Sequence, residues 1–185
     1  DLGAKGYFGP SVGSIDYMTA VNQFLTGQAG MFYMGSWILA NFNDPAQNQI
    51  GEENIGFIPF PDVEGGAGSS DQLAANVGVP LAMSKAAYND DTAAWLTCIA
   101  ENFGSESLKE QGVITGFATN QPVEGLPPLT NLVQEKIADT EQSVLWFEAL
   151  FNAKAATTSQ SNASLLVTGE MSPEQFMEAV QADIQ

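Results

Sequence analysis

Hydrophobic residues in the first third of the chain occur in two patterns, a helical repeat and short unbroken runs. Residues 15–25 repeat hydrophobic side chains at helical spacing, with Ser14 as a candidate N-cap and Gly27 as a stop. Residues 29–34 (AGMFYM) and 55–60 (IGFIPF) are short apolar runs, which are typical of buried strands. The pattern therefore predicts one amphipathic helix followed by two short strands.

The middle of the chain continues this alternation. A second helical pattern opens at Gly35 and Ser36 and carries Trp37 in its first turn. Residues 61–72 are rich in Gly and Ser and form the best candidate for an internal boundary. Residues 77–83 (VGVPLAM) then predict a third short strand.

A longer helix is expected after this third strand. Asn89 is its N-cap, and Trp95 belongs to its apolar face, which we assign to the core. A separate short helix is expected from Ser105 to Gly112, and residues 113–128 are expected to form an irregular loop.

The remainder of the chain predicts helices only. The first three cover about residues 130–138, 140–155 and 159–167. The last begins at residues 172–175 (SPEQ), where Ser at the N-cap, Pro at N1 and Gln at N3 form a capping box. A few short strands followed by many helices indicate an α/β fold that is helix-rich at its C-terminus.

The charge of the chain narrows the classes of ligand. It carries 22 acidic and 5 basic residues for a formal net charge of −17, which repels nucleic acids and anionic lipid surfaces. All five basic residues are lysines, so the bidentate recognition of anions that arginine provides is missing. A neutral or cationic ligand therefore fits the composition better than an anionic one.

Histidine is also absent, which removes the commonest general base and transition-metal ligand, and we expect no cofactor and no metal. The single cysteine, Cys98, lies in the apolar run 95–99 and is expected to be a buried thiol. The longest apolar stretch, residues 31–39, is too short to cross a bilayer. The first residues include no start methionine or signal peptide, so we expect part of a longer chain.

Several segments, in this order, carry a resemblance to a known family. Residues 24–37 (FLTGQAGMFYMGSW) resemble the pattern "F..GkaAM...GsW" of the extracellular sugar-binding proteins of ABC importers, the family that includes maltose-binding protein. Residues 55–66 (IGFIPFPDVEGG) are similar to its "iG..P.P...gg" segment, and residues 112–122 (GVITGFATNQP) to its "G.lP" loop. Residues 165–184 (LLVTGEMSPEQFMEAVQADI) resemble its closing helix.

The resemblance implies a two-lobed fold of which this chain holds mostly the C-terminal lobe. It assigns residues 1–72 to that lobe, residues 73–128 to a crossover strand and helices associated with the N-terminal lobe, and residues 129–185 to a helical segment that returns. It also implies a sugar or oligosaccharide ligand, ABC transporter permease subunits as partners, and an extracytoplasmic location. Contact with the membrane would come only through a lipid anchor on the missing N-terminal part.

Trp37 is the first candidate for a ligand-binding residue. The apolar face of a pyranose stacks on an indole ring, and ligands of α/β sheets bind beyond strand ends near helix N-termini. The family commonly places a stacking tryptophan at this Gly-Ser-Trp position, so Gly35 and Ser36 join the expected site. The alternative is a core tryptophan, since tryptophan is highly buried on average.

Four further residues are expected to bind ligand because of the resemblance. Trp146 is expected to open the helix after Thr140 and to stack on sugar, with core packing against Leu150 as the alternative. Asn76 and Gly78 are expected to lie in a stretch that family members often use to hydrogen-bond sugar hydroxyls, with a turn asparagine as the alternative for Asn76. Asn120, in the loop after Gly116, could make the same contacts, with plain solvent exposure as its alternative. These last three join the expected site.

Other functions stay open at this point. A glycoside-processing enzyme needs two facing carboxylates, and no such pair stands out, so we expect no catalytic residues. A polyamine or other cationic solute is the main competing ligand, because acids and aromatic rings would enclose it. A purely structural or adaptor role comes third.

Overall fold

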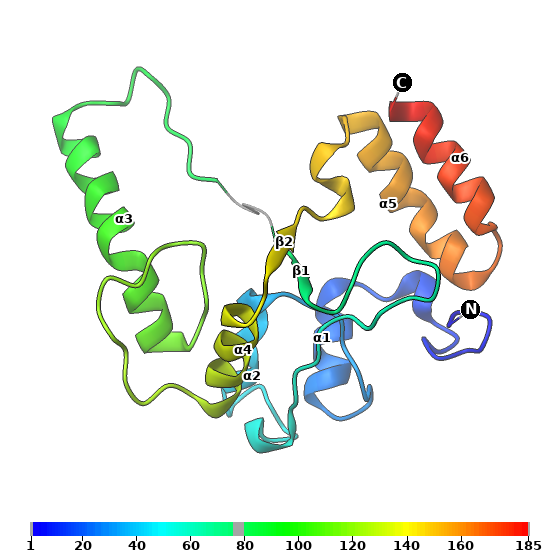
Figure 1. Ribbon diagram of the computed structural model, residues 1–185, viewed down its shortest axis with the longest axis horizontal. Coiled ribbons are helices and arrows are strands. Elements are labelled where there is room, and N and C mark those ends of the chain that lie inside the picture. Colours follow the sequence, from blue (N-terminus) through cyan, green and yellow to red (C-terminus); the bar gives the residue numbers. More distant parts are fainter. Residues whose placement is uncertain (1, 76–79, 185) are drawn as a thin grey trace. The chain divides into compact units, whose positions relative to one another are not determined.

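Figure 1 shows the computed structural model of the chain, which describes residues 2–75 and 80–184. The chain divides into two compact units. One comprises Asp1–Val21 with Leu145–Gln185, and the other comprises Asn22–Val144. We call them the terminal unit and the central unit.

The helices and strands are short in the first half of the chain and longer in the second. In chain order they are η1 (Val12–Ser14), α1 (Tyr17–Leu25), η2 (Ser36–Ile38), α2 (Leu39–Asn43), η3 (Glu52–Asn54), β1 (Gln72–Ala74), α3 (Asp90–Gln111), α4 (Pro128–Ala138), β2 (Gln142–Val144), η4 (Phe147–Leu150), α5 (Ala153–Thr168) and α6 (Pro173–Ile184). The helix-rich α/β fold expected from the sequence is confirmed.

In the terminal unit, α5 and α6 form an antiparallel pair (Figure 1). Ala155 and Val180 are buried, and η1 packs against α5. The predicted capping box of α6 is confirmed: the backbone N–H of Ser172 donates to Gln175 Oε1 at 2.9 Å, and the N–H of Gln175 donates to Ser172 Oγ at 3.2 Å. The local sequence thus sets where α6 begins.

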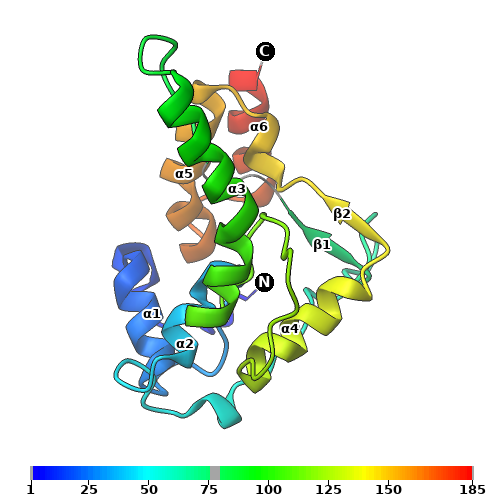
Figure 2. The ribbon, with the colours of Figure 1, turned by 90° about the vertical axis from the view of Figure 1, so that its left-hand side faces the viewer.

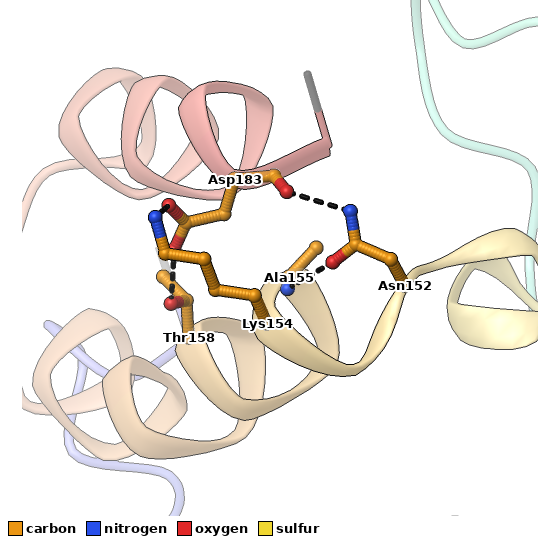
Figure 3. Close-up of polar contacts among 5 residues, drawn as sticks. All are labelled: Asn152, Lys154, Ala155, Thr158 and Asp183. Carbon is orange, nitrogen blue, oxygen red and sulfur yellow. Dashed lines mark hydrogen bonds and ion pairs between the residues drawn. The ribbon is translucent and has the colours of Figure 1, made fainter.

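Polar contacts hold the start of α5 to the end of α6 (Figure 3). Asn152 Oδ1 accepts the N–H of Ala155 at 2.9 Å, and Asn152 Nδ2 donates to the carbonyl of Asp183 at 2.7 Å. The Asp183 carboxylate pairs with Lys154 at 2.6 Å and accepts from Thr158 Oγ1 at 2.5 Å. The hydrogen bond from Lys154, followed by that from Thr158, lowers the pKa of Asp183 below its ordinary value of 3.8.

The central unit is organised around the short helix α2, which contacts both α3 and α4. Its buried side chains come from α1, η2, α2, α3 and α4, and they are Leu25, Ile38, Leu39, Phe42, Leu108, Leu129 and Val133. Because most of these elements are separated in sequence, this core forms only when they meet.

Hydrogen bonds join the same three helices at the end of α3. Asn43 Nδ2 donates to Thr130 Oγ1 and to the carbonyl of Gln111, both at 3.2 Å. Thr130 Oγ1 donates to the carbonyl of Gly112 at 2.8 Å and is fully buried. We call Asn43, Gly112 and Thr130 the Asn43 cluster. Gly112 ends α3 in the left-handed conformation with φ 65°, which confirms the predicted helix end.

Two predicted strands are not strands in the structure. Residues 29–34 and 55–60 form no ladder, and the sheet of the described residues consists of β1 and β2, parallel, with Gln72 opposite Gln142 (Figure 2). A strand requires a hydrogen-bonded neighbour, and neither segment has one within the described residues. Of the third predicted strand, residues 80–83 are not a strand, and residues 77–79 lie outside the described part.

Three helix predictions were wrong. Residues 140–155 form β2, η4 and the start of α5, because helical periodicity alone does not exclude an extended segment that finds a strand partner. The short helix expected from Ser105 is the second half of α3, which runs continuously from Asp90. The N-cap of α1 is Asp16, whose carboxylate accepts the N–H of Thr19 at 2.8 Å, and not Ser14.

The core assignments of Trp95 and Cys98 were also wrong. Trp95 is 56% exposed, and Cys98 is exposed as well. Both lie in the first half of α3, whereas the residues of α3 that are buried, Gly104 and Leu108, lie in its second half. The predicted Asn89 cap is confirmed, since its side chain accepts the N–H of Thr92.

We expect the acid sensitivity of the terminal unit to depend on Asp183. A carboxyl with a lowered pKa contributes stability that is present above its unfolded pKa and is lost as the pH falls through its folded pKa. Urea unfolding between pH 7 and pH 2, followed at helix α6, should show this loss in the wild type and a smaller loss in Asp183→Asn. Glu178→Gln, an exposed carboxylate on the same helix, is the control. Equal pH dependence in Asp183→Asn and wild type would contradict this role.

We expect Gly112→Ala to destabilise the central unit. A side chain in the left-handed conformation costs about 1–2 kcal/mol, and a Cβ here would also lie 2.8 Å from Thr130 Oγ1. Gly116→Ala is the matched control, because nothing lies within 4 Å of its Cβ position. Denaturant midpoints measure both variants. A Gly112→Ala midpoint equal to that of the control would show that the Asn43 cluster tolerates the change.

Candidate functional site

Trp37 lies in the first turn of a helix, η2, as predicted, but the buried strand expected before it at residues 29–34 is not a strand. Its side chain is 52% exposed, so the alternative of a core tryptophan is wrong for this chain. The next two residues, Ile38 and Leu39, are buried and fix the helix against the central unit. The indole is therefore attached to a buried turn while half of its own surface stays accessible.

Gly35 determines how the indole lies. Gly35 is the N-cap of η2 in extended conformation, and the Trp37 ring folds back over it. A Cβ on Gly35 would overlap ring atoms Cζ3 and Cη2 and would lie 2.6 Å from Cε3. Only glycine leaves room for this arrangement, in which the backbone supports the ring from one side.

Ser36 anchors the same turn to a distant loop. Its Oγ donates to the carbonyl of Ile114 at 3.0 Å, in a partly buried position. Its side chain does not cap the helix, which was one alternative. The hydroxyl proton is used inside the protein, so toward a ligand Ser36 offers its oxygen as an acceptor.

Asn120 lies in the loop after α3, and its side chain is tied down. Its Nδ2 donates to the carbonyl of Glu101 at 2.6 Å, and its backbone N–H donates to Ser105 Oγ at 3.1 Å. The residue is solvent-exposed, which was the alternative to a binding role, but these two hydrogen bonds restrain its backbone and side chain. It lines an open depression of about 340 Å³ between α3, the loop and α4.

Trp146 belongs to the terminal unit and precedes η4 in extended conformation, so the prediction that it opens a long helix was wrong. It is 36% exposed, and Leu150 is 82% exposed, which removes the alternative of core packing between these two residues. Asn76 and Gly78 lie outside the described residues. The structure thus brings Gly35, Ser36 and Trp37 together with the loop after α3.

One exposed aromatic pair was missed. Tyr33 and Phe60 meet edge to face with ring centroids 5.9 Å apart, and Tyr33 is 77% exposed. The neighbouring Phe32 instead stacks on Phe24, with ring centroids 5.8 Å apart. No signal in the sequence marked this pair, because residues 55–60 (IGFIPF) show no alternation of apolar and polar positions.

The shifted titratable groups serve local structure. Gln47 and Ala46 lower the pKa of Asp44 through hydrogen bonds, and Glu110 raises that of Lys109 with help from Glu106. Within the described residues, no group of three or more His, Cys, Asp or Glu side chains is placed to hold a metal ion. None of the helices described here is both long and apolar enough to cross a membrane. What the site offers is an aromatic surface with neutral polar groups.

Comparison with known proteins gives two matches. The model of the family described as bacterial extracellular solute-binding protein matches residues 2–101. A solved structure titled "Chitin oligosaccharide binding protein" is similar in fold, with a TM-score of 0.76 and 24% sequence identity. The similarity covers 98% of this chain and 45% of that one, so this chain spans less than half the length of that protein. No curated protein matches the sequence.

We expect Gly35→Ala to displace the Trp37 indole from the backbone. The variant is made with Trp95→Phe and Trp146→Phe, so that Trp37 alone reports. Its emission should shift to the red and be quenched more by acrylamide, because the added methyl group pushes the ring into water. Gly30→Ala is the control, since nothing lies within 4 Å of its Cβ position. Unchanged emission in Gly35→Ala would contradict the close approach.

Proposed function

The chain belongs to the bacterial extracellular solute-binding proteins, and from this premise we propose that it binds carbohydrate and serves as the capturing subunit of an ABC importer. The solute is a neutral sugar or oligosaccharide. The protein hands it to the permease subunits in the membrane without changing it chemically, and it works outside the cytoplasm, in the periplasm or at the cell surface.

The observation that carries this proposal is the position of Trp37. Its ring is supported from one side by Gly35 and is 52% exposed. A flat aromatic surface held in one orientation suits the C–H face of a pyranose, and it loses little conformational freedom when the ligand binds. The neighbouring Ser36 oxygen and the loop carbonyls supply polar partners for sugar hydroxyls.

The charge of the chain disfavours an anionic ligand. It is compatible with a neutral or a cationic one. With a net charge of −17 and no arginine, the chain lacks the bidentate donor that commonly recognises phosphate or carboxylate. A polyamine is the competing ligand, because an acidic protein attracts cations. The neutral groups around Trp37 favour the sugar, and the binding experiment below includes both ligands.

The similar solved chain is more than twice as long as the part that this chain covers, which supports a larger, two-lobed protein. In this proposal the chain supplies mostly the C-terminal lobe. In this proposal residues 1–72 and 129–185 belong to that lobe, and residues 73–128 associate with the other. Trp146, Asn76 and Gly78 remain proposed ligand contacts within the cleft. Closure of both lobes around the sugar, stabilised by contacts that exist only in the closed state, would present the loaded form to the permease. A lipid anchor on the preceding segment would hold the protein at the membrane.

We expect Trp37→Ala in the full-length protein to weaken sugar binding by roughly thirtyfold, because an aromatic anchor that the ligand buries contributes ~2 kcal/mol or more. Isothermal titration with N-acetylglucosamine, its β-1,4-linked oligomers, maltooligosaccharides and spermidine measures the affinities. Trp95→Ala is the matched control, since Trp95 has a similar exposure of 56% and lies outside the proposed site. It should bind like the wild type.

Three outcomes would contradict the proposal in different ways. Tight binding of spermidine alone would replace the sugar with a cation. Equal loss in the Trp37 and Trp95 variants would remove Trp37 from the site. New reducing ends during incubation with the oligosaccharides, abolished by one Asp or Glu substitution, would make the protein an enzyme.

A further inference from the structure

Gly104 is a glycine inside a helix. It lies in the second half of α3 and is buried, although glycine is, after proline, the least favourable residue in a helix interior. A Cβ at this position would overlap the carbonyl oxygen of Ala118 and would lie 2.7 Å from that of Phe117. Both atoms belong to the backbone of the loop after α3, so no side chain can turn aside to make room. The missing Cβ therefore lets this loop lie directly against the helix.

Neighbouring contacts hold the loop in this position on α3. The ring of Phe117 meets that of Phe103 edge to face, with the ring centroids 5.2 Å apart. Three residues further on, Asn120 donates hydrogen bonds to the carbonyl of Glu101 and to Ser105 Oγ. These partners flank the glycine on both sides along the helix. The loop is thus fastened to one short stretch of α3.

The same loop holds the Trp37 turn. The carbonyl of Ile114 accepts the Ser36 hydroxyl at 3.0 Å, and Ile114 lies two residues after Gly112 and three before Phe117. Gly112 is fixed by the Asn43 cluster, and Phe117 is fixed by its contact with α3. A segment this short has few soft backbone torsions. The position of the Ile114 carbonyl therefore follows from both of these fixed ends.

We propose that Gly104 is a positioning residue of the Trp37 turn. Because it has no side chain, the loop backbone rests on α3, and the Ile114 carbonyl stays within reach of the Ser36 hydroxyl. The inference deepens the proposed function, in which the Trp37 ring contacts the ligand. It rests on that function only for its effect on binding, because the position of the ring can be observed without ligand.

Gly104→Ala should displace the loop. An ordinary C···O contact is about 3.4 Å long, so the loop backbone has to retreat from the added methyl group by roughly 1 Å. The second half of α3 gives way less easily, because it carries the buried residues of this helix. Half of that displacement at Ile114 would lengthen the Ser36 hydrogen bond from 3.0 Å to about 3.5 Å, close to the limit for a hydrogen bond. The Trp37 turn would then lose its link to the loop.

Fluorine NMR of the full-length protein labelled with 5-fluorotryptophan tests this link. Each tryptophan gives one line, which is assigned by its loss in a phenylalanine variant. Gly104→Ala should shift the Trp37 line and leave the Trp95 line in place. In a Ser36→Ala background it should shift the Trp37 line no further, because the hydrogen bond that transmits the displacement is already absent. Gly116→Ala, in the same loop, is the matched control and should not shift the line, since nothing lies within 4 Å of its Cβ position.

Phe117→Leu is a second variant that adds no atoms between the loop and the helix, and it carries the test if Gly104→Ala does not fold. Leucine removes the ring contact with Phe103, which loosens the loop from the other side. The Trp37 line should again shift while the Trp95 line does not. This shift should also vanish in the Ser36→Ala background.

Titrations of the full-length protein with N-acetylglucosamine oligomers and maltooligosaccharides relate the link to function. Affinity for a sugar that the wild type binds should fall roughly two- to twelvefold in Gly104→Ala, the loss expected for one hydrogen bond. If no sugar binds the wild type, the proposed function fails, and the fluorine line still decides whether Gly104 positions Trp37. A Trp37 line unmoved by both loop variants, or shifted equally with and without the Ser36 hydroxyl, overturns the inference.

Discussion

The central unit depends on the Asn43 cluster, where one buried hydroxyl and one amide join α2, α3 and α4. Thr130 Oγ1 donates to the carbonyl of Gly112 and accepts from Asn43, so the end of α3 is held between the other two helices. Buried hydrogen bonds contribute modestly when made, but a buried group left without its partner costs more. The three helices therefore pack with this one geometry, and the loop that leaves Gly112 starts from a fixed place.

The candidate binding residues lie on and beside the loop that begins at this fixed point. The loop passes Ile114, whose carbonyl receives the Ser36 hydroxyl, and then Asn120, which bonds back to α3. The Trp37 turn and the depression beside Asn120 are positioned by the same segment of backbone. The proposed binding residues thus lie on irregular chain held at both ends by regular elements, which is the usual place for such residues.

The side chains of the candidate site are uncharged, although the chain as a whole is strongly acidic. A chain with a net charge of −17 stays soluble and repels anions and nucleic acids at long range. Short-range recognition then relies on an aromatic ring, hydroxyl oxygens and amides, all uncharged. Such groups select by shape and by hydrogen-bond pattern, which suits the proposed reversible binding of a neutral solute.

The sequence by itself determined the features that depend on neighbouring residues: the Asn89 and Ser172 caps, the end of α3 at Gly112, and the turn that carries Trp37. Charge and composition, with the segment order, also indicated the fold class and the family. Tertiary structure alone decided that Trp95 is exposed and that Gln134 shares a depression with the loop after α3. The physical reason is range: a cap is satisfied within one helical turn, whereas burial and ladder pairing depend on elements that are distant in sequence.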